Sequence, residues 1–66
     1  MIYVDVIGDL LSVTVREEVH TVPFSEKAYE KLSKLSEEAQ AVETMEEYNK
    51  IESKTLSKIL KYSVNN

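Results

Sequence analysis

Hydrophobic and polar side chains alternate along the first fifteen residues, with the two-residue period of a β-strand. Gly8-Asp9 is a favoured two-residue hairpin turn, and it sets Ile7 opposite Leu10. In that register one face is aliphatic and is formed by the pairs Val6 with Leu11, Val4 with Val13, and Ile2 with Val15. The polar face carries Tyr3, Asp5, Ser12, Thr14 and Arg16. The pattern therefore predicts an antiparallel hairpin whose aliphatic face packs against the rest of the chain.

The next segment is open to two interpretations. Arg16-Glu17-Glu18 is a candidate turn, after which Val19–Val22 returns as a third strand. That turn contains no Gly, Asn or Asp, so a bent or bulged extension of the second strand is the alternative. Pro23 ends either version, because its ring nitrogen carries no hydrogen to donate to a sheet.

Helical signals begin after Pro23. Ser25 is a candidate N-cap, and Phe24 with Tyr29 has the spacing of a hydrophobic staple across the start of a helix. The apolar stripe of this helix alternates four- and three-residue steps through Ala28, Leu32, Leu35, Ala39 and Val42. We expect a helix over residues 25–42 that lies on the aliphatic face of the hairpin.

A break between two helices is the better interpretation of the remaining chain. In one straight helix Leu32 and Ile59 would lie on opposite sides, which a single core cannot cover. Thr44 and Glu47 form a capping box that starts a second helix, over 44–63, with residues 64–66 as a frayed tail. The alternative is one long helix that serves two different partners. The predicted fold class is α+β: an N-terminal antiparallel β-hairpin or three-stranded meander (1–24) followed by two amphipathic helices.

Length and composition place this fold in one small domain, residues 1–66. There is no cysteine, and the single histidine leaves little scope for a structural metal, so association is the remaining way to support a small core. The net charge of −4 disfavours nucleic acid as a partner. The sequence shows neither a secretion signal nor an apolar run long enough for a membrane span, so we expect a cytoplasmic protein.

Catalytic chemistry is hard to find in the sequence. His20 has only Glu18 nearby as an orienting group, and the expected role is a half-exposed strand histidine. The carboxylates Asp5, Asp9, Glu17 and Glu18 lack the spacing of a calcium loop. The sequence has no glycine-rich phosphate loop, nucleophile elbow or zinc spacing. We therefore expect no enzyme, cofactor or metal.

Charge is distributed unevenly along the two helices. Residues 37–47 hold five glutamates and no basic residue, whereas 48–66 hold four lysines and one glutamate. The lysines fall within an arc of about 80° on the second helix, and they are Lys50, Lys54, Lys58 and Lys61. They form either a solvated face or a binding strip for an acidic partner, which includes the glutamates of another copy. Tyr3 on the polar face of the hairpin is a further candidate contact.

The apolar arc of the second helix is wider than one hairpin and one narrow helix are expected to cover. We therefore predict a homodimer or small oligomer with an interface formed by Tyr48, Ile51, Leu56, Ile59 and Tyr62. The predicted function is a non-enzymatic protein-binding module, an inhibitor or adaptor. The alternatives are a structural or assembly component, such as a virion or scaffold part, and a sponge for a small anionic ligand.

In size, acidity and lack of a catalytic signature the chain resembles the small inhibitor and accessory proteins of bacteriophages, including those that antagonise bacterial defence systems. The resemblance covers the whole length and involves no motif. It implies an inhibitory role toward a host or defence protein and assigns no individual residue.

Overall fold

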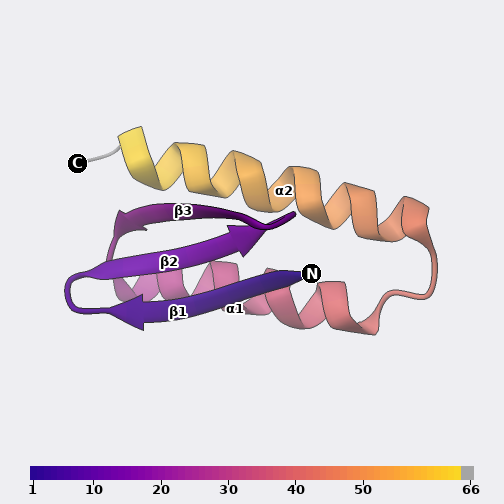
Figure 1. Cartoon of the computed structure of the whole chain (residues 1–66), viewed down its shortest axis with the longest axis horizontal. Coiled ribbons are helices and arrows are strands. Elements are labelled where there is room, and N and C mark those ends of the chain that lie inside the picture. Colours follow the sequence, from indigo (N-terminus) through magenta and orange to yellow (C-terminus); the bar gives the residue numbers. More distant parts are fainter. Residues whose placement is uncertain (65–66) are drawn as a thin grey trace.

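The computed structural model describes residues 1–64 and contains a three-stranded antiparallel meander followed by two helices (Figure 1). The strands are β1 (Ile2–Ile7), β2 (Leu10–Val15) and β3 (Glu18–Pro23), in the sheet order β1-β2-β3. The predicted register is confirmed for each of the four pairs from Ile7 with Leu10 to Ile2 with Val15. The third strand is confirmed as well, because β3 pairs with β2 along its whole length.

The two hairpin turns differ in their chemistry. Gly8 has a φ of 60°, which a glycine adopts without strain at the first position of a two-residue turn. At the second turn both Arg16 and Glu17 have positive φ, 52° and 67°, the condition for a type I′ turn. Residues other than glycine, asparagine and aspartate rarely adopt a positive φ. Arg16 and Glu17 therefore gave no signal in the sequence for the turn that they form.

Both helices begin directly after the N-cap residues predicted from the sequence, Ser25 and Thr44. In α1 (Glu26–Ala41) the Ser25 hydroxyl accepts a hydrogen bond from the Ala28 amide at 3.1 Å, and Phe24 stacks on Tyr29 with ring centroids 6.2 Å apart. In α2 (Met45–Val64) the Thr44 hydroxyl accepts from the Glu47 amide at 3.1 Å. The break is therefore confirmed. The frayed tail was predicted over residues 64–66. Val64 is instead the last residue of α2, and residues 65–66 lie outside the described residues.

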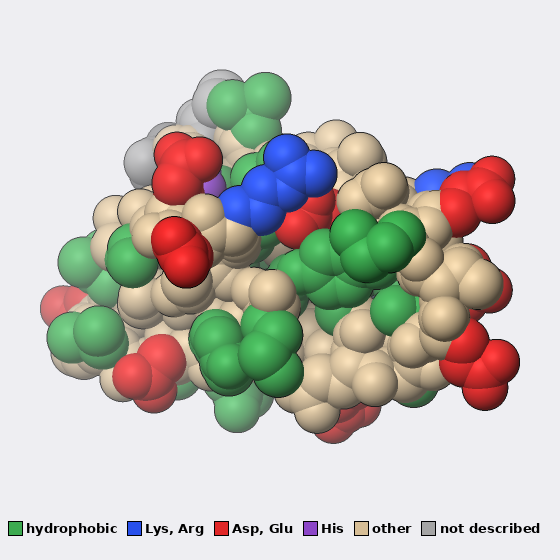
Figure 2. Space-filling view, turned by 45° about the vertical axis from the view of Figure 1, so that its right-hand side comes forward, with side chains coloured by type: hydrophobic (Ala, Val, Ile, Leu, Met, Phe, Trp, Pro, Cys, Tyr) green, Lys and Arg blue, Asp and Glu red, His purple; other side chains and the backbone are tan. Residues whose placement is uncertain are grey.

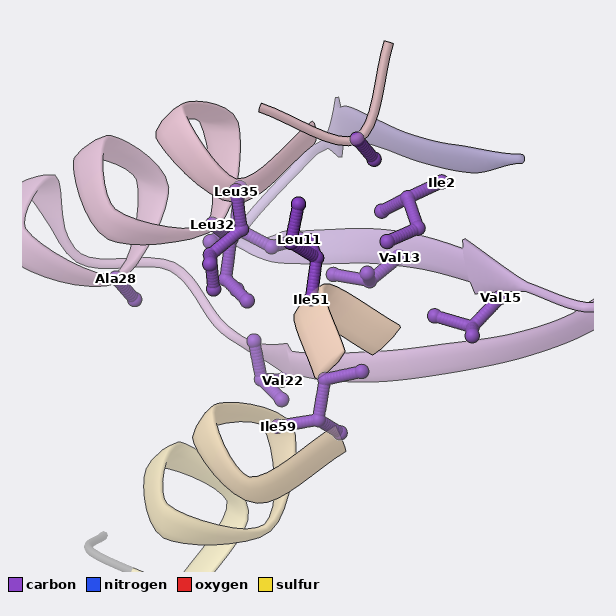
Figure 3. Packing of buried hydrophobic residues seen from close by; sticks show 11 residues of the cluster. Ile2, Leu11, Val13, Val15, Val22, Ala28, Leu32, Leu35, Ile51 and Ile59 are labelled. Carbon is purple, nitrogen blue, oxygen red and sulfur yellow. The ribbon is translucent and has the colours of Figure 1, made fainter. Parts of the chain in front are cut away.

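The core lies between one face of the sheet and the two helices. α1 crosses behind the sheet and packs against β1, while α2 runs along β3 and packs against α1 (Figure 1). The buried side chains come from all five elements: Ile2, Leu11, Val13, Val15, Val22, Ala28, Leu32, Leu35, Ala39, Ile51 and Ile59 (Figure 3). The predicted stripe of α1 is confirmed, with Val42 partly buried at its end.

The aliphatic face of β1 is covered unevenly. Ile2 is buried, Val4 is partly buried, and Val6 is exposed. The buried end is tied to α1, because the Ser36 hydroxyl donates a hydrogen bond to the Ile2 carbonyl at 2.7 Å. At the other end the Asp5 carboxylate accepts from the Val6 amide at 3.0 Å, which occupies one donor of this edge strand with a local partner. The prediction that the whole aliphatic face of the hairpin packs against the rest of the chain is thus wrong at Val6.

The two leucines of β2 provide a matched test of the register. Leu11 is fully buried toward the helices, whereas its neighbour Leu10 points to the opposite face and is 44% exposed. Leu11→Ala should lower the free energy of unfolding by about 2–5 kcal/mol, and Leu10→Ala by less than about 1 kcal/mol. Urea denaturation followed by circular dichroism measures both. Equal losses for the two variants would contradict the register.

Candidate functional site

A groove runs between the two helices on the side away from the sheet, with a volume of about 420 Å³. From α1 it is lined by Lys31, Lys34, Leu35 and Glu38. From α2 it is lined by Ser53, Lys54, Ser57 and Lys58. We call this surface the lysine groove.

Helical spacing and the short connection between the helices place these side chains together. Lys31, Lys34 and Glu38 follow one edge of α1 at helical spacing, and Lys54 and Lys58 are one turn apart on α2. The helices are joined by residues 42–44 only, so α2 folds back beside α1. Lysines that are twenty or more positions apart in the sequence therefore border one groove.

The groove is positively charged although the chain is acidic. Four lysines and one glutamate line it, a formal charge of +3, whereas the whole chain carries −4. The two serines add neutral hydroxyl groups, which donate and accept hydrogen bonds. Ammonium and hydroxyl groups at one concave surface suit carboxylates or phosphates as ligands.

The predicted lysine strip is divided by the structure. Lys54 and Lys58 line the groove, whereas Lys50 and Lys61 are exposed outside its lining, with the Lys61 ammonium 6.0 Å from the Tyr62 ring centre. The sequence reasoning missed Lys31 and Lys34. The predicted break could have indicated them, because two helices joined by a short loop lie side by side, which brings lysines of the first helix near those of the second. Tyr3 is 55% exposed on the sheet and far from this lining, and its hydroxyl donates to the Met1 sulfur at 3.0 Å.

Most residues of the predicted oligomer interface are used within the chain itself. Ile51 and Ile59 are 8% and 6% exposed and belong to the core (Figure 3). Tyr48 and Tyr62 are partly buried against that core, and Leu56 is 41% exposed. Outside the predicted set, Met45 and Leu60 are the more exposed apolar residues of α2, at 71% and 67%. The apolar arc that α2 leaves exposed is narrower than predicted, because α2 packs against β3 and buries Ile51 and Ile59.

A buried carboxylate lies on the inner side of α2. Glu52 is 3% exposed, and its Oε1 is 2.6 Å from Nε of Arg16, whose side chain is 67% exposed. The pair joins the β2–β3 turn to α2. One turn further along, the Thr55 hydroxyl donates to the Ile51 carbonyl at 2.8 Å. With its charge already paired, Glu52 is a structural link between sheet and helix.

The single histidine lies on the inner face of the sheet. His20 is partly buried and projects from the same face of the sheet as Val13 and Val22, so Glu18 and His20 share that face as predicted. Among residues 1–64 the structure brings together no group of three or more His, Cys, Asp or Glu side chains suited to a metal ion. Within the same range, neither helix is both long enough and apolar enough to span a lipid bilayer.

Comparison with protein-family models, curated proteins and solved structures finds no match for this chain.

Tyr48 provides a pH-dependent test of the buried polar region. Its hydroxyl is buried and makes no hydrogen bond of good geometry among the described residues, and burial, followed by the nearby Glu52 carboxylate, raises the pKa of the phenol. A raised pKa in the folded state gives stability that is present below the unfolded pKa of about 10 and is lost as pH rises through the folded pKa.

Tyr48→Phe should keep or slightly raise the free energy of unfolding at neutral pH, because it removes a buried hydroxyl that makes no hydrogen bond of good geometry. It should also reduce the loss of stability between about pH 9 and about pH 11. Urea titrations across this range measure both effects, with the exposed Tyr3→Phe as the control. If Tyr48→Phe lost stability with rising pH as steeply as the unaltered chain, the alkaline loss could not be assigned to Tyr48.

Proposed function

We propose that this protein is a non-enzymatic binding module, an inhibitor or adaptor, whose lysine groove binds an acidic segment of another protein. The observation that supports this is the positive groove on an acidic chain. A net charge of −4 repels acidic partners in general, so attraction is confined to the surface where lysines from two helices meet.

The shape of the groove favours an extended segment over a compact metabolite. It follows the contact between two helices and has lysines along both sides, which matches a chain of repeated carboxylates. Lysine binds carboxylates and phosphates alike as a flexible point charge. The net charge of −4 disfavours a long phosphate backbone beyond the groove, so we favour carboxylate-rich peptide over nucleic acid.

The charge of the groove can be tested with a matched pair of double variants on α2. Lys54→Glu with Lys58→Glu reverses two charges that line the groove, and Lys50→Glu with Lys61→Glu reverses two that do not. We expect the groove variant to weaken binding of a fluorescent oligoglutamate peptide by about tenfold or more, and the control variant by less than about threefold. Fluorescence anisotropy at several salt concentrations measures the affinities.

Both variants should fold, because Lys50, Lys54 and Lys61 are exposed, Lys58 is half-buried at the groove, and surface charges contribute little to stability. Binding by the unaltered chain should also weaken as salt increases. A single-stranded oligonucleotide of equal charge is the competitor. Equal weakening by the two double variants would mean that the peptide responds to the net charge of the protein and not to the groove. Tighter binding of the oligonucleotide than of the peptide would mean that the groove binds nucleic acid.

A further inference from the structure

The lysine groove is lined mainly by charged residues, yet most of the surface that it presents is apolar. Five of its eight lining residues are lysine or glutamate, but carbon atoms form the larger part of the lining surface. Lysine accounts for this difference, because its four-carbon stem lies along apolar surface while its ammonium group stays in water. A ligand in the groove therefore meets both ammonium groups and apolar surface.

Leu35 is the centre of this apolar surface. It is the one apolar residue of the lining, and at 9% exposure it is also the most buried of the eight. Leu35 belongs to the hydrophobic core as well, so packing against the core fixes its position in the groove. We call Leu35 and the lysine stems beside it the apolar floor.

The lysines lie on both sides of the apolar floor, because α1 and α2 run antiparallel (Figure 1). Those of α1 are Lys31 and Lys34, and those of α2 are Lys54 and Lys58. Glu38 also lines the groove, and of the α1 residues there it is the nearest to the helix connection. A ligand carboxylate beside Glu38 would be repelled by it. An interrupted acidic segment therefore suits this lining better than an unbroken run of carboxylates.

Burial of the apolar floor would add affinity that the charges alone do not supply. Exposed ion pairs are weakened by water and by salt. Carboxylates that pair only with the lysines would leave the floor in contact with water, whereas a large apolar side chain placed on it removes that water. The groove volume of about 420 Å³ offers space for such a side chain.

We propose that the lysine groove selects acidic segments in which one large apolar residue, leucine or phenylalanine, stands between carboxylates. The apolar side chain packs on Leu35, and the carboxylates beside it meet the lysines of the two helices. This inference rests on the proposed function and deepens it, because it states which acidic segments the groove binds most tightly.

The groove differs in this respect from the apolar areas on the sheet side of the molecule. Figure 2 views the sheet and the helix connection, and there the hydrophobic side chains form several separate areas, with acidic side chains more widespread than basic ones. Acidic segments are attracted less to a face of that charge than to the groove, where lysines border the apolar floor.

The first experiment compares two peptides of equal charge. Each has six glutamates around a central residue, which is leucine in one peptide and serine in the other. We expect the leucine peptide to bind about tenfold more tightly or better, because the floor buries its side chain. Fluorescence anisotropy at several salt concentrations measures both affinities. Both should weaken as salt increases, while the ratio between them persists, because apolar burial is not screened.

The second experiment alters the floor and leaves the lysines in place. Leu35→Gln puts an amide on the floor at nearly the same size, and it should reduce the preference for the leucine peptide to less than about threefold. Leu60→Gln is the matched control, since Leu60 is 67% exposed on α2 and lies outside the groove lining; it should keep the full preference. Urea denaturation measures the stability of each variant, and the peptide comparison on the unaltered chain decides the proposal if Leu35→Gln does not fold.

The outcomes separate this inference from the proposed function. If both peptides bind with equal affinity, the groove binds acidic segments without selecting an apolar residue, and only this inference is overturned. If Leu60→Gln removes the preference and Leu35→Gln does not, the apolar residue packs outside the groove, which also overturns it. If neither peptide binds, the proposed function fails as well.

Discussion

The structure depends on covering one aliphatic sheet face with two helices that lie side by side. Neither helix is wide enough to shield three strands, so α1 packs on β1 and α2 packs on β3, with Ile51 and Ile59 completing the core. This arrangement requires the break at residues 42–44, because a continuous helix would carry the second apolar stripe away from the sheet. The Arg16–Glu52 ion pair then joins the exposed β2–β3 turn to a carboxylate that is buried on the inner side of α2.

The lysine groove is a consequence of the same packing. Two helices on one sheet face leave a furrow between them on the solvent side, and its chemistry is set by the residues beside the buried stripes. In α1 these are Lys31 and Lys34, and in α2 Lys54 and Lys58. The groove thus requires no loop or cofactor to shape it, and its charge can change in evolution without a cost to the core.

Covering only one face leaves the sheet with two different surfaces. The helices carry most of the charged residues outward, whereas the open sheet face keeps threonine, serine, tyrosine and aliphatic side chains. Among the described side chains, exposed apolar residues occur on the sheet as well as on α2: Tyr3, Ile7, Leu10 and Val19 on the sheet, and Met45, Leu56 and Leu60 on α2.

The sequence by itself determined the first hairpin and the start of each helix, since strand alternation, Gly8, Ser25 and the Thr44–Glu47 box are local signals that act within a few residues. It also determined that Lys54 and Lys58 share one helix face, because helical rotation fixes that relation. Only the tertiary structure decided the turn at Arg16 and Glu17, whose positive φ is held in place by pairing along β2 and β3 and by the link to Glu52. It alone also decided that Ile51 and Ile59 face the chain's own sheet and that lysines of both helices border one groove. Those outcomes depend on how separate elements pack together, and a local pattern carries no information about the neighbour that will cover it.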